Sequence, residues 1–158
     1  MDDVVIRRPT KADVEELIAN MRQADIDEVH ATGGTVRGSV EEGVAISTLC
    51  YAAVLKGELA CIFGVAPLGG SLLADEGVPW LLGTPVMTKR ARSVIRLARG
   101  YIEQMLQTHG KLLNFVDARN TKAIGWLKRM GFQLSDDPVP YGRNKEPFFK
   151  FTMSPDHV

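Results

Sequence analysis

The stretch that most constrains the fold of this chain is the apolar run at residues 51–68, YAAVLKGELACIFGVAPL, which is broken by a polar turn at residues 56–58. Small and branched apolar residues on both sides of a short glycine-containing break are typical of two strands joined by a tight turn. The sequence therefore predicts an antiparallel hairpin here. Because 158 residues is the length of one ordinary domain, we expect this hairpin to belong to a single sheet in one domain spanning residues 1–158.

Helices and strands alternate around the predicted hairpin. Val4 and Ile6 alternate with charged residues and predict a first strand, and helical spacing then predicts a helix capped at Thr10. A second helical region is expected to open at Ser39, after a glycine-rich loop at residues 31–38. Further strands are expected at residues 79–84, 111–116, 132–134 and 147–153, and further helices from about Thr88 to Gly110 and at residues 120–131. This order favours an α/β (α+β) fold with one mixed sheet and helices on its faces.

Several classes of protein are disfavoured by the sequence. No apolar run approaches the roughly 18 residues of a membrane span, and the start MDDVVIRRP is acidic where a signal peptide would be basic and then apolar. Cys50 and Cys61 lie in apolar stretches, as expected of buried thiols in a reducing compartment. His30, His109 and His157 are far apart and lack neighbours at metal-ligand spacing. We therefore expect a cytoplasmic protein without a metal site.

Charge is distributed unevenly although the net charge is zero. Residues 1–88 carry a balance of −7 and residues 89–158 a balance of +7, which favours a localised anion-binding face over general affinity for nucleic acid. Four cations at helical spacing form one stripe: Lys89, Arg92, Arg96 and Arg99. This stripe has three interpretations, namely the solvated face of an amphipathic helix, a phosphate site at the helix start, or a nucleic-acid contact, which the zero net charge makes unlikely.

The segment at residues 117–134, DARNTKAIGWLKRMGFQL, resembles the closing motif of the GCN5-related N-acetyltransferase (GNAT) superfamily. The matching residues are Asn120, Ala123, Trp126, Lys128, Gly131 and Phe132. The order of the predicted elements matches that superfamily along almost the whole chain. The resemblance implies a GNAT-like, mostly antiparallel sheet, splayed between its fourth and fifth strands at residues 80–84 and 111–116. The pantetheine arm of acetyl-CoA, the implied cosubstrate, would enter there, whereas Trp126 and Phe132 are expected to be core residues.

The resemblance also implies a loop after the fourth strand whose backbone amides hold the pyrophosphate of acetyl-CoA. Small residues are needed there, because a side chain would keep phosphate oxygens from the N–H groups at the helix start. With Pro85 at the place of the family's proline, Thr88 replaces the leading cation, and Ala91 and Ser93 replace the two glycines. The implied cofactor-binding residues are Thr84, Val86, Lys89, Arg90, Ala91, Arg92, Ser93 and Asn120.

The residues that would catalyse acetyl transfer are harder to find. The reaction needs a base for the acceptor's ammonium group and an acid for the departing thiolate. In many GNAT enzymes a tyrosine acid follows the aromatic residue matched by Trp126, but this chain has Leu127 there. Its fourth strand, at residues 80–84, carries no carboxylate, and Asp75 and Glu76 are expected in the preceding loop. The remaining candidates for the acid are two tyrosines, Tyr51 and Tyr141. We therefore expect slow or undetectable acetylation of an amine.

Residues 82–132 also resemble the small GNAT-like internal virion and head-assembly proteins of short-tailed phages. The matching residues are Tyr101, Met105, Leu106, residues 113–116, Asn120, Ile124, Leu127, Lys128 and Gly131. This second resemblance implies a catalytically degenerate protein with phage virion proteins as partners, located in the host cytoplasm or the virion. The sequence alone leaves both interpretations open.

Overall fold

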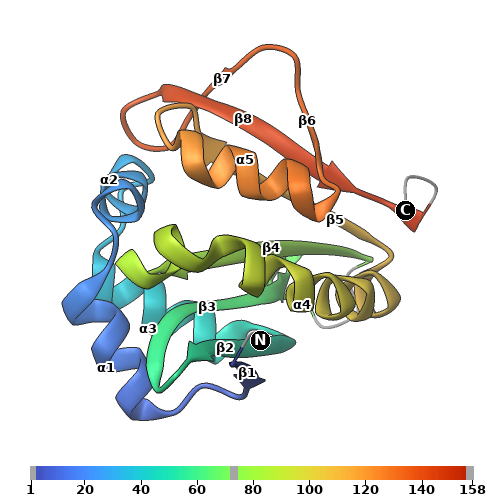
Figure 1. The fold of residues 1–158 in the computed structure, drawn as a ribbon. Coiled ribbons are helices and arrows are strands. Elements are labelled where there is room, and N and C mark those ends of the chain that lie inside the picture. The colour runs from blue at the N-terminus through green and yellow to red at the C-terminus, as the bar shows by residue number, and fades with distance from the viewer. Residues whose placement is uncertain (1–2, 72–74, 156–158) are drawn as a thin grey trace.

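The structure is a computed structural model that describes residues 3–71 and 75–155 (Figure 1). The strands are β1 (Val4–Arg7), β2 (Leu49–Leu55), β3 (Glu58–Pro67), β4 (Glu76–Gly83), β5 (Lys111–Asp117), β6 (Gln133–Leu134), β7 (Val139–Tyr141) and β8 (Glu146–Met153). The helices are α1 (Lys11–Asn20), α2 (Gln23–Ala31), α3 (Val36–Ile46), α4 (Pro85–His109) and α5 (Thr121–Met130), with a 3-10 turn η1 (Leu68–Gly70). None of the helices in these described ranges is long and apolar enough to cross a membrane.

The strands form one sheet in the order β1-β2-β3-β4-β5-β8-β6, with β7 paired to β8. Every neighbouring pair is antiparallel except β4 and β5, which run parallel. Helices α4 and α5 cover one face of the sheet, and α1 to α3 lie toward the other (Figure 1). The predicted fold class, a mixed and mostly antiparallel sheet flanked by helices, is confirmed.

The predicted hairpin is the pair β2–β3. Lys56 and Gly57 form its turn with positive φ angles of 49° and 82°, as a two-residue turn between twisted antiparallel strands requires. Strand β3 is buried along almost its whole length because helices pack on both of its faces. The hairpin therefore forms the centre of the part of the sheet that precedes β4.

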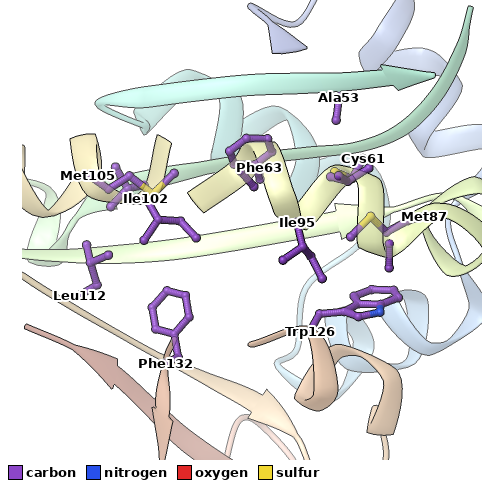
Figure 2. Packing of buried hydrophobic residues seen from close by; sticks show 14 of the residues in the cluster. Ala53, Cys61, Phe63, Met87, Ile95, Ile102, Met105, Leu112, Trp126 and Phe132 are labelled. Carbon is purple, nitrogen blue, oxygen red and sulfur yellow. The ribbon is translucent and has the colours of Figure 1, made fainter. Parts of the chain in front are cut away.

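The larger hydrophobic core lies between the sheet and the helices α4 and α5 (Figure 2). Trp126 and Phe132 are each only 6% exposed in this cluster, which confirms that both are core residues. Phe132 packs edge-on against Phe151, with ring centroids 5.2 Å apart. A second core cluster on the opposite face joins the sheet to α1, α2 and α3 through residues such as Leu17 and Val40.

Two details of the N-terminal helices differ from the prediction. Helix α3 begins at Val36, where the Thr35 hydroxyl accepts a hydrogen bond from the backbone N–H of Gly38 at 3.0 Å, so the predicted start at Ser39 is wrong by one turn. Ser39 is followed three residues later by a glutamate, a stronger capping signal in the sequence than Thr35 followed by Gly38. The loop is consequently only residues 32–35, and the separate helix α2 before it was not predicted.

The start of α4 also lies earlier than expected. Thr84 caps the helix by accepting a hydrogen bond from Val86 N, and Pro85 occupies the first helical position, where its fixed φ angle is favourable. Arg90 departs from helical geometry, with φ −125° and ψ 24°, so the first turn is kinked relative to the rest of the helix. The predicted start near Thr88 is therefore three residues late. Strand β7, which lies between the predicted strands at residues 132–134 and 147–153, was not predicted.

The predicted splay between the fourth and fifth strands is confirmed. Strands β4 and β5 pair only at their first residues, Glu76 with Lys111 and Gly77 with Leu112, and then diverge. One side-chain bond crosses the gap beyond that point, from Asn114 Nδ2 to the backbone oxygen of Pro79 at 2.7 Å. The splay leaves a space between the carboxyl-terminal halves of the two strands.

A candidate active site in the splayed sheet

Helix α2 bridges the open end of the splay, where β4 and β5 reach their carboxyl-terminal residues. At the end of β4, Gly83 accepts a hydrogen bond from Arg22 N and donates one to Asp25 Oδ2, both at 2.8 Å. At the end of β5, the backbone N–H of Asp117 donates to Glu28 Oε1 at 2.8 Å. Because Asp25 and Glu28 are three residues apart, they share one face of α2. That face is held against both strands.

Asp25 is part of a buried polar network. Arg22 forms an ion pair with it at 2.9 Å, and Asn120 Nδ2 donates a hydrogen bond to Asp25 Oδ1 at 3.2 Å. The Arg22 guanidinium also donates to Thr88 Oγ1 at 3.0 Å and lies 4.5 Å from the ring centre of Trp126. Burial raises the pKa of Asp25 above its usual value, although the attraction of Arg22 opposes this shift. The network links α2 to α4 and α5.

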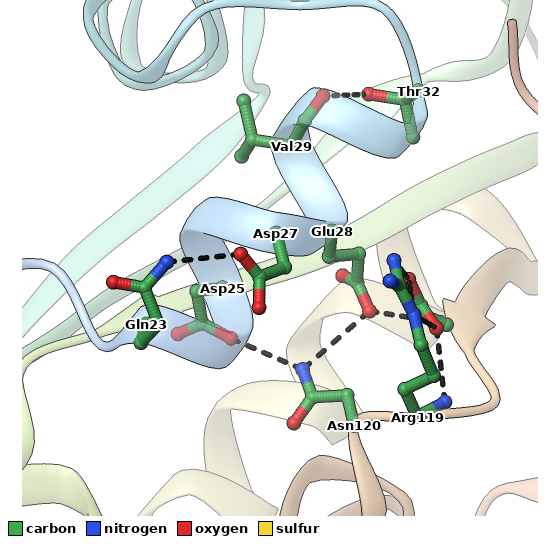
Figure 3. Close-up of polar contacts among 9 residues, drawn as sticks. Gln23, Asp25, Asp27, Glu28, Val29, Thr32, Arg119 and Asn120 are labelled. Carbon is green, nitrogen blue, oxygen red and sulfur yellow. Dashed lines mark hydrogen bonds and ion pairs between the residues drawn. The ribbon is translucent and has the colours of Figure 1, made fainter. Parts of the chain in front are cut away.

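Glu28 differs from the neighbouring carboxylates because no ion pair among the described residues includes it. Its Oε1 accepts the bond from Asp117 N and a longer one of 3.5 Å from Asn120 Nδ2 (Figure 3). Asp117 itself is paired with Arg119 at 2.7 Å. Burial raises the pKa of Glu28 to about 7, and the nearby negative charges of Asp25 and Asp117 act in the same direction. Glu28 can therefore take up or release a proton near neutral pH.

A cavity of about 270 Å³ lies in the splay, between α2, the diverging strands, α5 and the β7–β8 hairpin. Asp25, Glu28 and Asn120 lie in its polar part. The aromatic residues that line it are Trp80, Phe115, Trp126, Tyr141, Phe148 and Phe151. Tyr141 stacks on Phe115, with ring centroids 4.2 Å apart and 16° between the planes. The cavity thus combines a few carboxylate and amide groups with a largely apolar, aromatic wall.

A second hollow, of about 520 Å³, lies between the first part of α4 and a face of α5 that extends from Thr121 to Arg129. Its cations are Lys89, Arg92, Lys122 and Arg129, and we call this hollow the basic groove. None of the ion pairs found within the described residues engages any of these four cations. Trp126 lines both the basic groove and the cavity, so the two adjoin at this residue. An elongated molecule that carries phosphates at one end matches this arrangement.

The structure distributes the predicted cofactor-binding residues over different places. Asn120 lines the cavity, and the predicted candidate acid Tyr141 lines the same cavity. Three predicted residues line the basic groove: Lys89, Ala91 and Arg92. Three others line a smaller hollow of about 140 Å³ beside the turn of the β2–β3 hairpin: Val86, Arg90 and Ser93. The hydroxyl of Thr84 is buried and donates to Leu59 O at 2.6 Å, so its part in the site is to cap α4.

The sequence analysis missed Asp25 and Glu28. Glu76, which begins β4, lies at the closed end of the splay, where it pairs with Lys111. The two missed carboxylates come instead from α2, a helix that was not predicted. Their spacing of three residues is a signal for a shared helix face, but it does not indicate which part of the sheet that face meets. Tyr51, the other tyrosine considered, donates to Gln104 Oε1 and is absent from the cavity lining.

Within residues 3–71 and 75–155, no three His, Cys, Asp or Glu side chains are grouped in a way that could hold a metal ion. His157 lies outside these described residues. Cys61 is fully buried and Cys50 partly so, and burial raises the pKa of the Cys50 thiol to about 11. Neither thiol lines the cavity or the basic groove.

No protein-family model matches the chain, and no curated protein matches it, but solved structures do. A ribosomal-protein-alanine N-acetyltransferase from Brucella melitensis superposes with a TM-score of 0.69 at 15% identity, covering 95% of this chain and 99% of that one. The aminoglycoside acetyltransferase AAC(6')-Ib, in complex with ribostamycin and coenzyme A, gives 0.69 at 17% identity, covering 99% and 96%.

The spermidine N-acetyltransferase from Vibrio cholerae, in complex with coenzyme A and spermine, gives a TM-score of 0.66 at 12% identity, covering 98% of this chain and 97% of that one. These likenesses show that the chain has the GNAT fold. They lend no support to the resemblance to phage virion proteins, so a virion partner stays a prediction from the sequence.

Proposed function

We propose that this chain is an acetyl-CoA-dependent N-acetyltransferase that acetylates an amine. The observation that carries the proposal is the splay between β4 and β5, which contains a cavity with two carboxylates and adjoins the basic groove, whose four cations have no ion pair within the described part of the chain. One substrate would thus be an anion that binds the basic groove and extends a narrow chain into the splay, and the other would be a cation that binds the carboxylates. Acetyl-CoA and a protonated amine have these properties.

The free edge of β4 and the basic groove support binding of two parts of acetyl-CoA, the pantetheine arm and the phosphates. Beyond Gly77, strand β4 has no pairing with β5, so the backbone groups on that edge, other than those of Pro79 and Gly83 that already bond protein groups, can bond the amides of a pantetheine arm. Lys89 and Arg92 from α4, with Lys122 and Arg129 from α5, can pair with its phosphates. Ala91 lies between the two α4 cations and is small enough to leave the groove open. Two of the structural relatives hold coenzyme A on this fold.

Catalysis in this cavity would begin with proximity, because holding an amine and a thioester together replaces a bimolecular encounter. Leu127 lies in the cavity wall at the position where the resemblance implies a tyrosine acid, and it cannot donate a proton. Tyr141, on the same wall, is the remaining candidate for protonating the sulfur. We therefore expect turnover below the ~10 s⁻¹ typical of enzymes.

The test is a calorimetric titration with acetyl-CoA, followed by measurement of thiol release in the presence of an amine. Three acceptors cover different amine classes: a peptide with an N-terminal alanine, ribostamycin and 2-phenylethylamine. Binding of acetyl-CoA together with thiol release that depends on one of these amines supports the proposal. Binding without release from any of them favours the catalytically degenerate alternative, which Leu127 suggests, and a protein that fails to bind acetyl-CoA contradicts the proposal.

A further inference from the structure

The charges around the cavity leave one carboxylate available for a ligand. Asp25 is neutralised by Arg22, and Asp117 by Arg119, in ion pairs of 2.9 and 2.7 Å. Glu28 has hydrogen bonds to one oxygen, Oε1, and no ion pair within the described part of the chain. Its side chain lines the cavity. A cation that enters the cavity can therefore pair with Glu28 without displacing a protein cation.

The rest of the cavity favours an apolar body of limited size. Its volume of about 270 Å³ lies just below the range of about 300–1,000 Å³ that is typical of small-molecule sites, and the end of a pantetheine arm would share it. Phe115, Tyr141 and Trp80 contribute aromatic surface to its wall. The second carboxylate of the cavity, Asp25, is already neutralised by Arg22, so a second ammonium group on the ligand would have no free carboxylate partner, and burying an unpaired charge is costly.

We propose that the acceptor is a small monoamine with an apolar or aromatic body, and that Glu28 binds its ammonium group and takes its proton. This inference rests on the proposed function, because it identifies the acceptor of the same reaction. It separates this chain from its structural relatives that bind spermine or ribostamycin, both of which carry several amino groups.

The proposed step balances as follows. One proton passes from the ammonium nitrogen to the carboxylate of Glu28, on the oxygen not bonded to Asp117 N. The nitrogen lone pair then attacks the thioester carbonyl carbon, so that a C–N bond forms and the carbonyl becomes an oxyanion. When the carbonyl re-forms, the C–S bond breaks and its electron pair leaves with the sulfur. The second nitrogen proton goes to that sulfur, giving the amide and coenzyme A, and Glu28 releases its proton to solvent.

The pH range of this role follows from the groups that face Glu28. Asp25 on the same helix and Asp117 on β5 are negative neighbours, Arg22 and Arg119 are committed to those two carboxylates, and the neutral amide nitrogen of Asn120 donates a hydrogen bond to Glu28 Oε1. With a pKa of about 7, Glu28 is mostly ionised at pH 8 and mostly protonated at pH 6. An alkylammonium group stays charged across this range, as lysine does. Binding of the amine should therefore be about tenfold weaker at pH 6 than at pH 8.

The experiment uses the full chain and three probes: 2-phenylethylamine, its uncharged analogue 2-phenylethanol, and spermine. Each is titrated calorimetrically at pH 6 and pH 8 into the natural protein, Glu28→Gln and Asp27→Asn. The last variant is a matched control, because Asp27 is an exposed carboxylate on the same helix and, among the described residues, it accepts a side-chain hydrogen bond only from Gln23. Thiol release from acetyl-CoA is measured for the same three proteins.

We expect the natural protein and Asp27→Asn to bind 2-phenylethylamine more tightly than the alcohol or spermine. Glu28→Gln should lose at least tenfold in affinity at pH 8, lose the pH dependence, and lose roughly 10²–10⁴-fold in kcat. Equal affinity of Glu28→Gln, or tighter binding of spermine, would overturn the specificity. Equal thiol release by Glu28→Gln, or none by the natural protein, would overturn the proton transfer. Because the amine titration needs no acetyl-CoA, failure of the proposed function is recognised separately, as absent binding of acetyl-CoA.

Discussion

The side chain of Asn120 makes one contact within its own helix and others to residues far away in the sequence. Its oxygen accepts a hydrogen bond from Ala123 N and caps α5, a role that its place before a helix predicts from sequence. Its nitrogen donates to Asp25 and Glu28, which lie more than 90 residues earlier in the chain. The motif in the sequence could identify Asn120, but it could not identify these partners, because only tertiary packing brings α2 to this point.

Glu28→Gln should stabilise the protein at alkaline pH. The pKa of Glu28 is about 7 in the folded state and about 4.5 when exposed, so the folded protein binds more protons between these values. Its stability therefore falls as pH rises from about 4.5 to 7, whereas glutamine is neutral throughout and its oxygen can accept the same two bonds. Urea unfolding at pH 8 should show a gain of up to about 3 kcal/mol that vanishes near pH 4.5. A similar gain in Asp27→Asn would contradict this origin.

At the scale of whole elements, the sequence predicted those helices and strands whose bounds are set by local turns and caps. The β2–β3 hairpin follows from a two-residue turn, and α5 ends where Gly131 adopts a φ of 103°, as its place after Met130 predicts. Helix α2 and strand β7 have weaker local signals and are stabilised largely by their neighbours. Both of these elements line the cavity, through Glu28 and Tyr141. The sequence therefore predicted the strands of the splay but not the elements that close it.

The contact between α2 and the β7–β8 turn should be sensitive to one methyl group. Gly142 has a φ of 78°, and a Cβ there would lie 2.4 Å from Ala31 O at the end of α2. Gly57 has a φ of 82° but open space around it, so Gly57→Ala is a matched control for backbone strain alone. We expect thermal unfolding to show a cost of about 1 kcal/mol for Gly57→Ala and clearly more for Gly142→Ala. Equal costs would mean that the turn can move away from α2 freely.

Across the whole molecule, the uneven charge of the sequence is divided between the cavity and the basic groove. The acidic first part of the chain supplies α2 and the carboxylates of the cavity, whereas the basic second part supplies the basic groove between α4 and α5. Trp126 lies between them and touches both. The sequence analysis left open whether the basic stripe is only a solvated helix face. In the structure Lys89 and Arg92 line the basic groove with two cations of α5, which favours an anion site.

Reversing one charge in the basic groove should weaken binding of the phosphates of acetyl-CoA and leave binding of its pantetheine arm unchanged. Arg92→Glu is expected to lower the affinity for acetyl-CoA about tenfold at low salt, because a nearby repulsive charge costs on the order of 1–2 kcal/mol. Calorimetry in about 0.5 M salt should show a smaller difference in acetyl-CoA affinity between Arg92→Glu and the natural protein, since salt screens exposed charges. S-acetylpantetheine, which lacks phosphates, should bind both proteins equally. Lys11→Glu makes the same change on the exposed start of α1, and an equal loss there would show that net charge, not the basic groove, attracts the substrate.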